Sequence, residues 1–220
     1  LEEKDEVIES KEKMSPAVRK SFLLILLSIV FWFMAYNAAT SKFSIYAGEV
    51  LKMKFTLPLL VAQAAAVISY IPIGIIASKF GRKKTILVGI IILTIAFILG
   101  TIATENTTFL IFITMGIAGI GWATINVNSY PMIVEMSKGS NVGKYTGYYY
   151  TASMAAQVVT PILSGAAMDY LLGRYEPRVL FPYSVLFCIL AFITMSFVRH
   201  GDSKPIPTKK LEAFADPEEK

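Results

Sequence analysis

Side-chain amides occur inside long stretches of the sequence that hold no charged residue. Away from the ends of these stretches, they are Asn37, Gln63, Asn126, Asn128 and Gln157. An amide both donates and accepts hydrogen bonds, so it suits an uncharged ligand with many hydroxyl groups. An amide in an apolar environment is also costly unless it is paired, and it therefore turns toward protein or water. These residues indicate a polar, uncharged binding site inside an otherwise apolar protein.

A row of polar residues runs through the segment 145–168. A glutamine near its middle favours a water-lined cavity, because such a side chain is expensive to bury. Close helix packing is the alternative, since small Ser and Thr side chains let helices approach and hydrogen-bond. We favour the cavity. The row recurs at spacings of three and four residues, which place its members on one helix face: Thr146, Tyr150, Ser153, Gln157, Thr160 and Ser164.

Trp122 and Asn126 lie four residues apart and therefore share one helix face, whereas Asn128 points roughly to the opposite side. Asn126 is thus the better candidate for a shared cavity. Trp122 is either an aromatic surface for a flat apolar ligand face or an ordinary part of the core. We expect the binding site to be formed by Tyr36, Asn37, Gln63, Trp122, Asn126 and Gln157.

Enzyme and metal chemistry lack the residues that they need. Acidic residues such as Glu49, Glu135 and Asp169 lie outside the charge-free stretches, toward the helix ends. A membrane enzyme with paired carboxylates is therefore not expected. Cys188 and His200 are single residues of their type, so we expect no metal site and no cofactor. We interpret His200 as a residue at the end of the last helix.

The segment 139–144 resembles a phosphate-binding loop only in part. Three residues separate its glycines where four are needed, and Tyr145 stands where a serine or threonine should follow the lysine. Nucleotide binding is therefore not expected.

Six stretches without Asp, Glu, Lys or Arg organise the chain, and each has at least twenty residues. About twenty apolar residues span the core of a bilayer as a helix. The composition agrees, with 55% hydrophobic and 17% charged residues, whereas soluble domains carry about 25% charge. We predict an all-α membrane protein with six transmembrane helices over 21–41, 55–78, 85–104, 106–134, 145–168 and 179–198.

Basic residues lie mostly on one side of this arrangement. Sixteen of the 21 Lys and Arg residues fall before the first stretch, in the second and fourth connections, or after the sixth stretch. Cytoplasmic loops carry this excess, so both termini are predicted to be cytoplasmic. The same bias explains the net charge of +5 without a nucleic-acid partner. We divide the chain into a charged cytoplasmic linker 1–20, a helical bundle 21–199 and a polar cytoplasmic tail 200–220.

The amides are unevenly distributed among the six predicted helices. The first, second, fourth and fifth stretches contain them, and the third and sixth contain none. We therefore expect four helices to face a protein interior and the other two to face lipid.

The second connection holds a recognisable motif. Residues 74–84 read Gly-Ile-Ile-Ala-Ser-Lys-Phe-Gly-Arg-Lys-Lys, which resembles the loop signature of the major facilitator superfamily. Ser78 replaces the aspartate of that signature, so the charge relay attributed to the aspartate is in doubt here. We expect the glycines to permit a tight turn and close helix approach, with the cations near headgroups or helix C-termini. The matching residues are Gly74, Lys79, Gly81, Arg82 and Lys83.

Further resemblance lies in the fourth and fifth helices. The segments Gly-Ile-Gly-Trp-Ala (119–123), Tyr-Pro-Met (130–132), Gly-Lys-Tyr-Thr-Gly-Tyr-Tyr-Tyr (143–150) and Thr-Pro-Ile-Leu-Ser-Gly (160–165) are similar to sugar–cation symporters of the glycoside–pentoside–hexuronide and sucrose type. The resemblance implies that the chain supplies helices 7–12, as two three-helix inverted repeats, and that a missing N-terminal six-helix half is its partner. Leu1 at the start also suggests a piece of a longer protein.

The resulting hypothesis is secondary active transport of a small polar solute, with a sugar or glycoside as the expected substrate. Alternating access would move it, and H⁺ or Na⁺ would be the coupling ion. A coupling carboxylate is absent from the six stretches, so coupling would reside in the other half, or transport would be passive. The alternative is a six-helix membrane subunit or scaffold that transports nothing.

Overall fold

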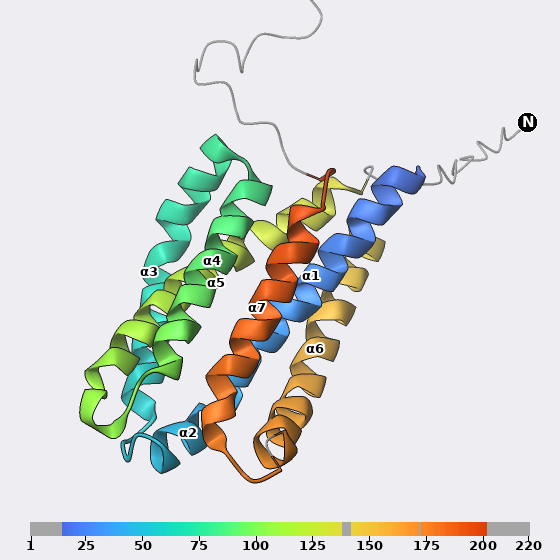
Figure 1. Ribbon diagram of the computed structural model, residues 1–220. Helices are drawn as coiled ribbons and strands as arrows, with labels where there is room; N and C mark the ends of the chain where they lie inside the picture. Colours follow the sequence, from blue (N-terminus) through green and yellow to red (C-terminus); the bar gives the residue numbers. More distant parts are fainter. Residues whose placement is uncertain (1–14, 138–141, 172, 202–220) are drawn as a thin grey trace, which may run out of the picture.

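The computed structural model describes residues 15–137, 142–171 and 173–201, which form a helical bundle (Figure 1). The predicted all-helical class is therefore confirmed. Its elements are α1 (Pro16–Ser41), α2 (Phe43–Glu49), α3 (Thr56–Phe80), α4 (Arg82–Thr101), η1 (Glu105–Thr107), α5 (Phe109–Glu135), α6 (Val142–Tyr170), η2 (Pro177–Val179) and α7 (Leu180–Ser196).

Five of these helical segments are long and apolar enough to cross a membrane. They are α1, α3, α4, α5 and the segment Pro177–Ser196, which contains α7. Helix α6 has 29 residues, enough to span the bilayer core, but its many tyrosine, serine and threonine side chains make it less apolar than the others. The helices thus occupy the six predicted stretches, while the membrane crossing of α6 rests on its length and its place in the bundle.

Helix α1 begins earlier than the predicted domain boundary. Pro16 occupies the first helical position, where its missing N–H and fixed φ suit a helix. The Ser15 side chain accepts a hydrogen bond from the Val18 N–H at 3.4 Å, which caps the helix. Residues 16–20 therefore belong to α1 and not to a linker. The rest of the predicted linker, most of the predicted tail and Gly139 of the phosphate-loop comparison lie outside the described residues.

The helices pack in an exchanged pattern that relates the two halves of the chain. Helix α1 packs between α6 and α7, whereas α5 packs between α3 and α4, and α4 contacts α7 across the middle. The first helix of each sequential set of three is thus inserted into the other set. Helices α1 and α5 also begin at opposite ends of the bundle (Figure 1). This is the arrangement expected of two inverted three-helix repeats.

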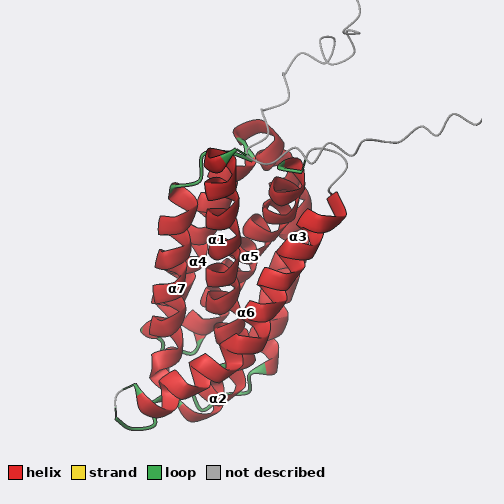
Figure 2. Cartoon of the chain, turned by 90° about the vertical axis from the view of Figure 1, so that its right-hand side faces the viewer, coloured by secondary structure: helices red, strands yellow, loops and turns green. Residues whose placement is uncertain are grey.

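Viewed from the side, the bundle has two outer faces with α1 and α5 between them (Figure 2). Helices α4 and α7 lie on one side, and α3 and α6 on the other. The exposed large hydrophobic side chains of α4 and α7 are aliphatic or phenylalanine, as expected of helices that face lipid. Helix α3 was predicted to be interior, yet only 17% of its apolar window is buried within this chain. Its remaining surface is open, on the same side as that of α6.

Two glycines of α5 bring its neighbours unusually close. A Cβ at Gly119 would overlap the backbone carbonyl oxygen of Ala62 on α3. A Cβ at Gly121 would come within 2.9 Å of the backbone nitrogen of Leu93 on α4. Small residues at helix interfaces permit such backbone contact in membranes, where packing replaces the hydrophobic drive. These contacts hold α5 between α3 and α4.

The chain after α7 folds across one end of the bundle. The His200 Nδ1 and the Arg199 N–H lie 2.9 Å and 3.2 Å from the Ser21 hydroxyl oxygen of α1. Val198 is fully buried. We call this the basic end: it comprises the start of α1, the α3–α4 turn, the end of α5, the start of α6 and residues 197–201. His200 therefore contacts another helix end, in keeping with its interpretation as a helix-end residue.

Candidate functional site

The two central helices meet through an aromatic cluster. The Trp122 ring of α5 stacks on the Tyr36 ring of α1, with centroids 4.1 Å apart and an interplanar angle of 6°. Phe33 of α1 contacts the same indole edge-on at 5.0 Å. One face of Trp122 is therefore covered, as the core-packing alternative for this residue requires. Trp122 remains half-buried, so it both packs the core and keeps an exposed part.

The Tyr36 side chain is almost fully buried, and its hydroxyl has no hydrogen-bond partner among the described residues. Asn37, the next residue, is half-buried and donates from Nδ2 to the Phe33 carbonyl oxygen at 2.8 Å. Part of the hydrogen-bonding capacity of Asn37 is thus used by its own helix. Tyr36 and Asn37 therefore differ: one hydroxyl is unpaired in the interior, and one amide is partly accessible.

Three amides keep their side chains free of any hydrogen bond to the residues that the structure describes. Gln63 on α3 and Gln157 on α6 are exposed, and Asn126 on α5 is half-buried. Asn128 differs, because it is fully buried and donates from Nδ2 to the Thr124 carbonyl oxygen at 2.8 Å. The accessible asparagine of α5 is therefore Asn126. Free amides on three helices can each donate and accept toward a ligand.

The polar row on α6 divides into two parts. Ser153, Thr160 and Ser164 are buried and donate to carbonyl oxygens of their own helix. Tyr150 and Gln157 are exposed. With about 100° per residue, Tyr150 and Gln157 lie on one edge of the row and the buried members on the other. Packing thus explains the small residues, and accessibility is limited to the tyrosine and the glutamine.

A tyrosine cluster, which sequence reasoning did not assign to the site, joins α5 to α6 near the basic end. The Tyr130 and Thr146 hydroxyl oxygens lie 3.1 Å apart, and the Tyr149 ring is 5.4 Å from the Tyr130 ring. Tyr150 packs against both tyrosines. The Tyr149 hydroxyl is also 3.3 Å from that of Ser129. The available signal was the run of three tyrosines at 148–150.

A further tyrosine, Tyr70, lies on α3, where its side chain is exposed. Because α3 and α6 lie on the same side of the bundle, with α1 and α5 next to them (Figure 2), we treat the amides and phenols of these four helices as one surface. We call this surface the amide–tyrosine face; it consists of Tyr36, Asn37, Gln63, Tyr70, Trp122, Asn126, Tyr130, Tyr149, Tyr150 and Gln157.

The predicted loop motif forms the turn between α3 and α4. Gly81 has φ 91° and ψ 149°, a backbone conformation that side chains disfavour, so glycine is required at this point. The expectation for Gly74 is wrong. A Cβ there would meet only the Val127 Cγ1 at an ordinary 3.9 Å, so Gly74 brings no helices unusually close.

Two cations of the motif bind to the ends of neighbouring helices. Arg82 forms an ion pair of 2.7 Å with Glu135 at the end of α5. Lys83 donates to the Ser196 carbonyl oxygen at 3.0 Å, at the C-terminus of α7 where a cation is favourable. Ser78 donates to the Ile75 carbonyl oxygen instead of pairing with a cation. Lys79 is exposed.

No group of three or more His, Cys, Asp and Glu side chains among the described residues could hold a metal ion. Cys188 is buried. The amide–tyrosine face can therefore offer neutral donors and acceptors and aromatic surfaces.

Comparisons with known proteins give a consistent answer. The family described as Major Facilitator Superfamily matches residues 22–217. A crystal structure of the peptide transporter POT in complex with sulfate is similar at a TM-score of 0.73 and 16% identity, covering 88% of this chain and 42% of the other. A bacterial homologue of the human drug peptide transporters PepT1 and PepT2 gives 0.70 and 19%, with coverage of 90% and 47%.

The human organic anion transporter MFSD10 (TETRAN) is similar at a TM-score of 0.63 and 11% identity, covering 85% of this chain and 49% of the other. At these identities the likeness concerns the fold alone. This chain spans less than half the length of each of the three transporters.

Proposed function

Because the chain belongs to the Major Facilitator Superfamily, we propose that it forms one half of a transporter that moves a small polar solute across a membrane. The proposed partner is a second six-helix half, which precedes it in the whole protein. Solved transporters of this fold are about twice as long as this chain, which supports the proposal. The open surface of α3, with its low burial, is where that second half would pack.

The observation that carries this function is the amide–tyrosine face. It includes side chains from the four helices α1, α3, α5 and α6. Its three free amides lie within stretches that hold no charged residue. A second half placed against it would enclose a polar cavity between the halves. Rocking of the two halves around that cavity would give alternating access.

A sugar or glycoside is the substrate class that this face suits. Hydroxyl groups of the solute would pair with Gln63, Asn126 and Gln157, which can donate and accept without imposing a charge. The exposed part of Trp122 and the ring of Tyr150 would contact the apolar side of a sugar ring. The peptide and organic anion transporters named above share the fold, and their substrates are the competing classes in the test below.

Coupling to H⁺ or Na⁺ would require groups outside this face. The charge-free stretches hold no carboxylate that could bind a proton or a sodium ion. We therefore place the coupling group in the second half. We also propose that the basic end faces the cytoplasm, because among the described residues it carries Arg19, Lys20, Lys79, Arg82, Lys83, Lys84, Lys144 and Arg199.

Uptake by the full-length protein in vesicles tests this function. Labelled monosaccharides, disaccharides, a dipeptide and an organic anion would each be offered with and without a pH or sodium gradient. Gradient-driven accumulation of a sugar supports the proposal. Accumulation of the peptide or the anion alone would contradict the substrate class, and no uptake of any solute by folded protein would favour the subunit alternative.

The same assay tests the site through Gln157→Ala and Asn126→Ala. Loss of one hydrogen bond to a neutral ligand corresponds to about a 3- to 10-fold weaker apparent affinity. Asn106→Ala is the control, because Asn106 is exposed within η1, which lies outside the four helices of the amide–tyrosine face. Equal effects of the three substitutions would contradict the assignment.

A further inference from the structure

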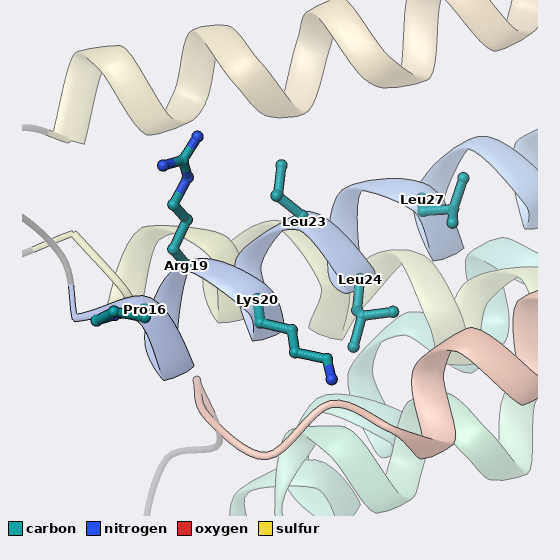
Figure 3. Close-up of a pocket in the computed structure, with 6 residues that line it drawn as sticks. All are labelled: Pro16, Arg19, Lys20, Leu23, Leu24 and Leu27. Carbon is teal, nitrogen blue, oxygen red and sulfur yellow. The ribbon is translucent and has the colours of Figure 1, made fainter.

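A shallow groove follows the first turns of α1 at the basic end (Figure 3). Arg19, Leu23 and Leu27 follow one another at intervals of four residues along one side of the helix. Lys20 and Leu24 lie on the adjoining side. The groove thus has cations at its outer end and leucines along its length. Pro16 completes the lining at the start of the helix.

The two cations are available to a ligand. Arg19 and Lys20 are exposed, and neither forms an ion pair with a residue in the described parts of the chain. Both immediately precede the charge-free stretch 21–41, so they lie where the membrane span begins. A positive charge at that depth sits among the lipid headgroups.

The leucines continue from the cations into the membrane-spanning part. Leu23 is 54% exposed and Leu27 is 42% exposed, so both present apolar surface beside the cations. With a rise of 1.5 Å per residue, Leu27 lies about 12 Å deeper along the helix than Arg19. The spacing allows an acyl chain to run along α1 while its phosphate stays at the interface.

Helix α6 adds a further cation and aromatic rings on its side of α1. The Phe22 ring of α1 lies 5.7 Å from the Tyr148 ring of α6. The Lys144 ammonium lies 5.9 Å from the centroid of the same tyrosine ring. Tyrosine and lysine at a membrane interface contact headgroups. The positive rim therefore extends over two helices and does not depend on the start of α1 alone.

We propose that this groove binds one anionic phospholipid of the cytoplasmic leaflet. Arg19 and Lys20 pair with its phosphate, and one acyl chain lies along Leu23 and Leu27. Charge complementarity identifies the headgroup, because the cytoplasmic leaflet is the one that carries anionic lipids. The leucines identify the lipid, since a free phosphate or sugar phosphate would gain nothing from them.

Native mass spectrometry of the full-length protein can measure lipid binding directly. The probes are dioleoyl-phosphatidylglycerol, dioleoyl-phosphatidylcholine and glycerol phosphate. The wild type is expected to retain phosphatidylglycerol in preference to phosphatidylcholine and to bind glycerol phosphate weakly. Each lost cation near the surface weakens attraction to an anionic lipid, so Arg19→Gln with Lys20→Gln lowers affinity for phosphatidylglycerol about 30-fold.

Two further variants make the experiment decisive. Lys52→Gln with Lys54→Gln removes two exposed cations from the opposite end of the bundle and should leave the binding unchanged. Leu23→Ala with Leu27→Ala keeps the helix and the charge, and should weaken dioleoyl-phosphatidylglycerol but not glycerol phosphate.

Several results would overturn the proposal. They are equal retention of the two lipids by the wild type, an equal loss in the Lys52/Lys54 control, or unchanged binding in the Arg19/Lys20 variant. The last result would mean that another part of the protein covers the groove.

Discussion

The stacked pair Tyr36–Trp122 shows how one contact can serve both packing and binding. The rings connect α1 to α5, the two central helices, with a centroid distance of 4.1 Å. Trp122 nevertheless keeps an exposed part. A solute bound beside it would therefore meet a side chain whose orientation is already fixed, which lowers the entropic cost of binding.

A double-mutant cycle can measure this contact. Tyr36→Ala, Trp122→Ala and the double variant would be compared by thermal unfolding of the full-length protein in detergent. We expect a coupling free energy of about 1 kcal/mol, in the range for aromatic pairs. Strictly additive effects would show that the stack contributes nothing beyond the separate burial of the two rings.

At the scale of single residues, the sequence identifies the amides but not their availability. Asn126 and Asn128 are the same residue type two positions apart, yet one is half-buried and free and the other is buried and bonded to its own helix. Helical periodicity correctly separated their directions. It could not show that Ser153, Thr160 and Ser164 pack inward. All members of the α6 row lie within a narrow arc of the helix surface, and both buried and exposed positions fall within that arc.

Helix α5 illustrates how whole elements are positioned. Its close approach to α3 depends on Gly119, and its approach to α4 depends on Gly121. The helices themselves were predictable, because charge-free stretches of twenty or more residues have few alternatives to a membrane span. Their exchanged packing was not predictable, since nothing in the sequence distinguishes these two glycines from Gly116, at which a Cβ would make only an ordinary contact.

Gly119→Ala tests the approach of α5 to α3. Because the new methyl group would overlap the Ala62 carbonyl oxygen, the helices must separate, and we expect destabilisation of about 1–3 kcal/mol. Gly147→Ala is the matched control, since a Cβ at Gly147 of α6 has no neighbour within 4 Å. A drop in melting temperature for the control as large as that for Gly119→Ala would contradict the close packing.

The turn between α3 and α4 offers a second matched pair. Gly81→Ala places a side chain at φ 91°, so we expect destabilisation of about 1–3 kcal/mol. Gly74→Ala lies inside α3, where alanine is the better helix former and the new methyl group fits. Thermal unfolding of both variants should show a loss for Gly81→Ala only. Equal stability of the two variants would refute the role of the left-handed turn.

At the scale of the whole molecule, the chain spans about half the length of the transporters that share its fold, and the proposed function therefore involves a second half. Of the four helices that carry the amide–tyrosine face, α3 and α6 lie on one side of the bundle (Figure 2), and α3 is the least buried of the five apolar helices. The sequence predicted an interior position for the four helices α1, α3, α5 and α6, and for α3 this position requires the proposed second half. Among the described residues of the amide–tyrosine face, Gln63, Tyr70, Tyr150 and Gln157 are exposed, so burial within this chain does not single them out.

Alternating access makes a specific demand on this face: the same residue must be reachable from each side of the membrane in turn. The most direct measurement is thiol labelling of Asn126→Cys in the full-length protein, with an impermeant reagent applied to either side of sealed vesicles. Asn128→Cys is the control, because Asn128 is buried, and the buried Cys188 should contribute little background.

We predict labelling of the cysteine at position 126 from both sides, slowed by the transported solute, with little labelling at position 128. Labelling from one side only, or labelling that no transported solute slows, would contradict the assignment of this face as the solute-binding wall of a transporter.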